Sequence, residues 1–226
     1  IGSTNSTADL PKEAPPQAFK SLRPWVHKGW EMVVIAAELV SPRSISLAEN
    51  PEVFSANYSL HCQEALKARK WDPCMVQEAL EKARRQALRT NRDNWLAMHK
   101  PFPSVLNLIK DLREEGIEIA ILTTKAAEFT HELLEFLHIQ EAQVFGHESG
   151  SKTQVLLELT QNQAVLGFIE DRRLTLEKIL AIPQLSSLKC YLATWGYLRP
   201  HDQANLPKGI SLLNPEDLSS PFASWH

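Results

Sequence analysis

AVLGFIEDRRLTL, residues 164–176, is the stretch that decides how the second half of the chain folds. The run 165–169 is apolar and rich in β-forming side chains, and Glu170 and Asp171 follow it at once. Residues 174–182 then have the pattern of a helix. A buried strand that ends in adjacent acids and leads into a helix is how a parallel sheet presents metal ligands at its carboxyl edge. The same stretch also fits a plain salt-bridged turn with an acid at a helix N-terminus.

Strand and helix patterns alternate through the rest of this half. The expected strands are 117–122, 144–145, 188–193 and 210–213, and the expected helices are 105–112, 128–137 and 153–161. Alternation at this spacing predicts an α/β fold with a Rossmann-like, doubly wound parallel sheet.

The first half of the chain has helical patterns only. Helices are expected at 22–40, 51–70, 73–89 and 92–99, and the polar, proline-containing residues from 1 to about 20 are expected to be flexible. We therefore predict two domains, a helical one at 1–98 and an α/β one at 99–226.

Composition excludes several classes of protein. The 226 residues are 43% hydrophobic and 23% charged with a net charge of -3, so nothing indicates a nucleic-acid or membrane partner. No apolar run approaches the roughly 20 residues of a membrane span. The three cysteines are too few for a disulfide framework and favour a reducing, cytoplasmic-type compartment. The oligomeric state stays open.

Polar side chains follow several of the predicted strands. Thr123 ends ILTTK, and its hydroxyl, beside Thr124 and the N–H groups of the next helix, is suited to donate to a phosphoryl oxygen. Lys152 precedes a helix, where its charge would neutralise an anionic nucleophile and a phosphate. Glu170 and Asp171 offer the oxygen ligands that Mg²⁺ prefers. A helix cap for Thr123 and an ordinary surface role for Lys152 are the alternatives.

ILTTK, SKTQVLLEL and GFIEDRRLTL, in this order, resemble motifs II, III and IV of the haloacid dehalogenase (HAD) superfamily. TWGYLRP resembles phosphoglycolate-phosphatase-like members, and LRPWVHKGWEMVV adds a likeness to uncharacterised cyanobacterial and plastid proteins. This likeness implies the plastid stroma as an alternative compartment. The resemblance implies a HAD-like core with a helical cap, a Mg²⁺ cofactor and hydrolysis of a small phosphorylated metabolite through an aspartyl-phosphate.

In that scheme each polar residue has a role. Thr123 would bind the phosphoryl group with Thr124 nearby, and Lys152 would stabilise the charge that the nucleophile and the phosphate share. Glu170 and Asp171 would hold the metal and its waters.

One part of the family pattern is missing. The nucleophile and the acid come from a D-x-D motif after the first strand, and no two aspartates here are two positions apart. We therefore expect the central first strand and the nucleophile to lie upstream of Ile1, on a further segment of roughly 40 residues. A catalytically inactive HAD-like protein that binds a ligand or another protein is the alternative.

Overall fold

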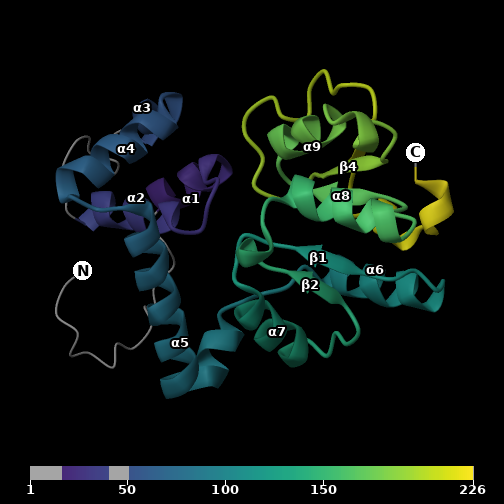
Figure 1. The fold of residues 1–226 in the computed structure, drawn as a ribbon, viewed down its shortest axis with the longest axis horizontal. Coiled ribbons are helices and arrows are strands. Elements are labelled where there is room, and N and C mark those ends of the chain that lie inside the picture. Colours follow the sequence, from purple (N-terminus) through teal and green to yellow (C-terminus); the bar gives the residue numbers. More distant parts are fainter. Residues whose placement is uncertain (1–16, 41–50, 226) are drawn as a thin grey trace. The chain divides into compact units, whose positions relative to one another are not determined.

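A computed structural model describes residues 17–40 and 51–225, and residues 1–16, 41–50 and 226 lie outside the described part. The chain divides into two compact units, Ile1–His99 and Lys100–His226, which are described separately below (Figure 1). Within the described ranges, no helix is long and apolar enough to cross a bilayer.

The first unit is helical throughout its described residues. Its elements are α1 (Gln17–Leu22), η1 (Arg23–Trp25), α2 (Glu31–Val40), α3 (Pro51–Ala56), α4 (Tyr58–Arg69) and α5 (Pro73–Ala97). The single helix expected at 22–40 is wrong, because the 3-10 turn of η1 and the non-helical residues after it interrupt the chain before α2. The helix expected at 51–70 is likewise divided, at Asn57. The part of the flexible opening that is described, residues 17–20, is helical.

The long helix α5 begins where its sequence indicates. Asp72 Oδ1 accepts hydrogen bonds from the backbone N–H of Cys74 (2.8 Å) and of Met75 (3.4 Å), and Pro73 occupies the first helical position. Asn91 has a non-helical backbone inside α5 (φ -157°, ψ 68°). This kink separates the two helices that the sequence predicts at 73–89 and 92–99.

The core of the first unit contains one buried ion pair. Arg69 of α4 contacts the Glu38 carboxylate of α2, and its Nη2 also donates to Ala37 O at 3.1 Å. The Glu38 side chain is fully buried and that of Arg69 is 8% exposed. The guanidinium lies over the Trp71 ring, 5.4 Å from its centroid. The guanidinium therefore has carboxylate, backbone and aromatic partners in a buried setting.

The second unit alternates helices and strands as predicted. Its main elements are α6 (Pro103–Glu114), β1 (Ala120–Leu122), α7 (Ala127–Phe136), β2 (Gln143–Phe145), α8 (Lys152–Asn162), β3 (Phe168–Glu170), α9 (Arg173–Leu180), β4 (Cys190–Ala193) and β5 (Ile210–Leu213). Short 3-10 turns lie at His147–Ser149 (η2), Pro183–Leu185 (η3), Asp217–Ser219 (η4) and Phe222–Ser224 (η5). The unit is a mixed α/β structure with parallel strands.

The five strands of this unit form two sheets. β1 pairs with β2, while β3, β4 and β5 form the second sheet in that order, and all three pairings are parallel. Only β4 has a neighbour on both sides, and all four of its residues are buried. The apolar core lies on two sides of this sheet. Leu156 of α8 and Leu176 of α9 pack on one side, and Leu108 of α6 packs with Trp225 on the other.

Candidate functional site

Glu170 and Lys152 form the centre of the candidate site. Glu170 is the last residue of β3, and Lys152 is the first residue of α8. Ser151 caps α8, because its Oγ accepts a hydrogen bond from Gln154 N at 3.3 Å. In return, Gln154 Oε1 accepts from Ser151 N at 2.9 Å. This reciprocal capping box fixes the start of the helix. Lys152 Nζ contacts a carboxylate oxygen of Glu170 as an ion pair. The structure thus brings these two predicted site residues together.

The ion pair lies in a partly enclosed position. The Glu170 side chain is 6% exposed and that of Lys152 is 26% exposed. Burial raises the pKa of the Glu170 carboxyl, and the nearby Lys152 ammonium opposes this by favouring the carboxylate. The negative charge of Asp171 pushes the pKa of Glu170 further upward. Burial outweighs the ammonium of Lys152, so the pKa of the Glu170 carboxyl stays above its ordinary value.

Asp171 is fixed by the loop that follows β4. Its Oδ2 accepts a hydrogen bond from Tyr197 N at 3.0 Å. A Cβ atom added at Gly196 would stand 2.1 Å from Asp171 Cβ, so only glycine allows this approach. The sequence patterns did not predict that Gly196 and Tyr197 position Asp171. The only signal for this role was a glycine in the TWG stretch directly after a predicted strand. Asp171 Oδ1 is the carboxylate oxygen that this contact leaves available.

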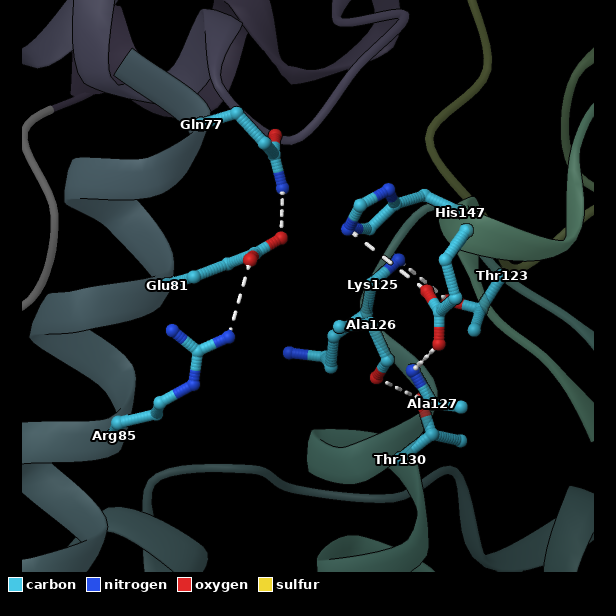
Figure 2. Close-up of polar contacts among 10 residues, drawn as sticks. Gln77, Glu81, Arg85, Thr123, Lys125, Ala126, Ala127, Thr130 and His147 are labelled. Atoms are coloured by element: carbon cyan, nitrogen blue, oxygen red, sulfur yellow. Dashed lines mark hydrogen bonds and ion pairs between the residues drawn. The ribbon is translucent and has the colours of Figure 1, made fainter. Parts of the chain in front are cut away.

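Thr123 lies at the carboxyl end of β1, in the other sheet. Its N–H donates to Phe145 O at 2.9 Å, and its Oγ1 accepts from Lys125 N at 3.1 Å (Figure 2). Because the hydroxyl accepts in this turn, its hydrogen points elsewhere and is suited to donate to a ligand. Thr124 beside it is exposed. Within the described chain, Thr123 bonds with Phe145 of β2 and with Lys125 of its own loop, and not with Lys152 or the acids.

The N-terminus of α7, next to Thr123, already holds an anion. Glu148 Oε1 accepts from Ala127 N at 2.8 Å, and the other carboxylate oxygen lies 3.9 Å from His147 Nε2 (Figure 2). A Cβ added at Gly146 would come within 2.4 Å of Ala127 N and of Glu148 Oε2, so glycine is needed for this fold-back. Ala127 N is one of the helix-start amides that were expected to help bind a phosphoryl group, and in this structure a carboxylate of the chain binds it.

The donor set limits which metal fits the site. In the described residues no group of three or more His, Cys, Asp or Glu side chains is placed to hold a metal ion. Glu170 and Asp171 alone supply carboxylates, and Glu170 is already paired with Lys152. Mg²⁺ commonly takes one or two protein carboxylates and keeps waters or phosphate oxygens as its other ligands. The residues present thus fit a hydrated Mg²⁺ on Asp171.

A cavity of about 970 Å³ in the second unit lies elsewhere. It is lined by residues 116–119, which precede β1, and by 137–139, which follow α7. The exposed Arg113–Glu141 ion pair borders it. This cavity is at the amino ends of β1 and β2, away from Thr123, so it is not the predicted site.

No family model, no curated protein and no solved structure matches the chain.

Proposed function

We propose that the second unit is a Rossmann-like, HAD-type core and that its site serves Mg²⁺-dependent hydrolysis of a small phosphomonoester. The observation that carries the proposal is the Lys152–Glu170 ion pair with Asp171 beside it, at the carboxyl end of a parallel strand. A cation and two carboxylates in this position are what an α/β sheet needs to bind a metal–phosphate pair.

Each residue has a chemical task in this proposal. The Lys152 ammonium would attract the phosphoryl oxygens while keeping Glu170 ionised. Asp171 would hold the metal, with its orientation fixed by Tyr197 N, and Glu170 would orient the metal's waters. The Thr123 hydroxyl would donate to a phosphoryl oxygen. Bound Mg²⁺ would supply charge that offsets the negative phosphate.

The nucleophile of this reaction is not assigned to any residue of the sequence. The aspartate at the end of β3 is Asp171, and the chain has no D-x-D pair. The two carboxyl groups of that motif would come from a segment outside the 226 residues. The chain itself would then bind phosphate and metal without turning over a substrate.

Titration calorimetry with inorganic phosphate, with and without MgCl₂, tests the site on the chain as it is. We expect binding that depends on Mg²⁺ and that weakens about tenfold or more in Lys152→Met, because one charged contact of about 1.4 kcal/mol changes affinity tenfold. Lys178→Met, which removes an exposed lysine from α9, is the matched control and should bind like the unmodified chain. Equal phosphate affinity in both variants, or phosphate binding that does not change when MgCl₂ is added, would contradict the proposal.

The missing D-x-D pair favours a second candidate, a HAD-like protein that binds a ligand or a protein without catalysis. Hydrolysis of p-nitrophenyl phosphate by the full-length natural protein separates the two. Mg²⁺-dependent turnover supports the phosphatase, whereas phosphate binding without turnover supports the non-catalytic protein.

A further inference from the structure

A cavity of about 670 Å³ separates the two sheets of the second unit. Two of its walls are formed by residues 117–122, which include β1, and by residues 164–169, which include the first two residues of β3. The other walls are apolar side chains, among them Leu156 of α8 and Leu108 of α6. The cavity therefore has strand edges on two sides and hydrophobic layers on the remaining two.

The β1 edge offers hydrogen-bonding groups to this cavity. Ile119 O accepts from Gln143 N, and Thr123 N donates to Phe145 O, each at 2.9 Å. In a parallel ladder, alternate residues of a strand bond to opposite neighbours. Ala120 and Leu122 therefore turn their N–H and C=O groups away from β2, toward the cavity.

The β3 edge mirrors this arrangement. Phe168 N donates to Lys189 O at 2.9 Å, so Phe168 faces β4. Gly167 and Ile169 consequently direct their backbone groups away from β4. Among the described residues, β1 pairs only with β2, and β3 pairs only with β4. The edges of β1 and β3 that face the cavity therefore have no paired strand.

Side-chain exposure at these edges is unusual for parallel strands. Ile169 is 36% exposed and Ala120 is also exposed, whereas β4, which is paired on both sides, is fully buried. Parallel strands in α/β proteins are normally covered on both faces and bonded on both edges. Two facing open edges also invite pairing with another segment.

We infer that this cavity is an acceptor site for one extended, apolar β-strand supplied from outside the 226 residues. The strand would bond to Ala120 and Leu122 on one side and to Gly167 and Ile169 on the other, as in β-strand addition. Its side chains would alternate between the α8 layer and the α6 layer, so both faces must be apolar. This inference does not depend on phosphate chemistry.

The stretches outside the described residues do not have the required sequence. Residues 1–16 are polar and carry three prolines, each of which removes an N–H donor. Residues 41–50 alternate serine with apolar side chains around SISLA, a pattern that is polar on one face. The occupant therefore comes from elsewhere.

The experiment uses a fluorescent peptide of about five consecutive β-branched residues between solubilising lysines, long enough to span β1 and β3. Its affinity for the whole chain is measured by fluorescence anisotropy, and amide hydrogen exchange follows the four edge residues. We expect saturable binding and slower exchange at Ala120, Leu122, Gly167 and Ile169. A peptide N-methylated at two adjacent central residues keeps its apolar surface but loses donors to both edges, and should bind about tenfold more weakly.

Ile169→Asp places a charge in the cavity and should abolish peptide binding. Leu212→Asp is the matched control, because Leu212 is a strand residue with nearly the same exposure (38%) that does not line the cavity. Circular dichroism checks that both variants fold.

The inference is overturned by absent binding, by equal affinity for the N-methylated peptide, or by equal loss of peptide binding in both variants. Protection of the same amides in a dimer of the chain alone would assign the groove to a second copy instead. Because phosphate is absent throughout, these outcomes are separate from those of the calorimetry.

Discussion

Each unit of the protein contains one enclosed acid–base pair, and the two pairs differ in their surroundings. Arg69 and Glu38 lie in a helical core, where Arg69 also donates to Ala37 O and lies over Trp71. Lys152 and Glu170 lie at the end of a strand, where the lysine side chain is 26% exposed.

The difference shows why burial of a charge does not by itself indicate a functional site. The guanidinium of Arg69 has backbone, carboxylate and aromatic partners, and its side chain is only 8% exposed. Lys152 has one carboxylate partner, and a second carboxylate, Asp171, follows that partner in the chain. A partly exposed cation beside two adjacent acids is what distinguishes the candidate site.

The largest expected effect comes from Arg69→Met. It leaves the Glu38 carboxylate buried without its cation, and we expect the free energy of unfolding of the first unit to fall by about 3–5 kcal/mol. Burial raises the pKa of Cys62 in this unit to about 12, so alkylation of this thiol during urea unfolding, followed by mass spectrometry, reports opening. Arg85→Met, which removes the more exposed Arg85–Glu81 pair (Figure 2), should cost about 1 kcal/mol or less. Equal losses in the two variants would contradict the structural role of Arg69.

Lys152→Met should have a smaller effect on stability than on phosphate binding. Because Lys152 is partly solvated and Glu170 can take up a proton, we expect a loss of about 1–2 kcal/mol, between the values for buried and exposed pairs. Alkylation of Cys190 in β4, whose pKa burial raises to about 11, reports opening of the second unit. A loss as large as that of Arg69→Met would mean that Lys152 is a structural residue like Arg69.

The smallest effect is a pH dependence that belongs to Glu170. Its pKa is raised in the folded state, so the folded state holds this proton more tightly than the unfolded state does. The resulting stability is complete below the unfolded pKa and is lost as the pH rises through the folded pKa. The melting temperature of Glu170→Gln minus that of the unmodified chain should therefore increase as the pH rises, by a few degrees or less.

Melting curves recorded between acidic and neutral pH in EDTA measure this difference. Glu141→Gln, at an exposed position, is the control and should show no such trend. A difference that shrinks with rising pH would show that Lys152 outweighs burial at Glu170.

The sequence predicted the elements of the second unit well, because the periods of its apolar residues and the positions of its turn residues indicate the same helices and strands. The strands β1, β3 and β4 are shorter in the structure than predicted, whereas β5 has the predicted bounds. Residues 117–119 and 165–167 continue the patterns of β1 and β3 but lie outside the ladders. A strand is defined by its hydrogen-bonded neighbour, and an apolar run cannot show where that neighbour ends. The interrupted helix at 22–40 has a similar explanation. Its apolar residues repeat with a helical period, but this period does not show that turns interrupt the chain before α2.

The candidate site could be predicted only in part. Lys152, Glu170 and Thr123 stand at strand ends or helix starts, and such positions are readable from local patterns. The contacts of Asp171 with Tyr197 and of Glu148 with Ala127 join residues more than 20 positions apart. Nothing in the local sequence specifies such partners, because they depend on how the loops meet.

The Glu148 carboxylate on the N-terminus of α7 has a consequence for selectivity. A group tethered by a short loop competes at an effective concentration in the millimolar range. A free anion must displace this tethered carboxylate to reach Ala127 N. Glu148 therefore protects the start of α7 against anions that bind only weakly from solution.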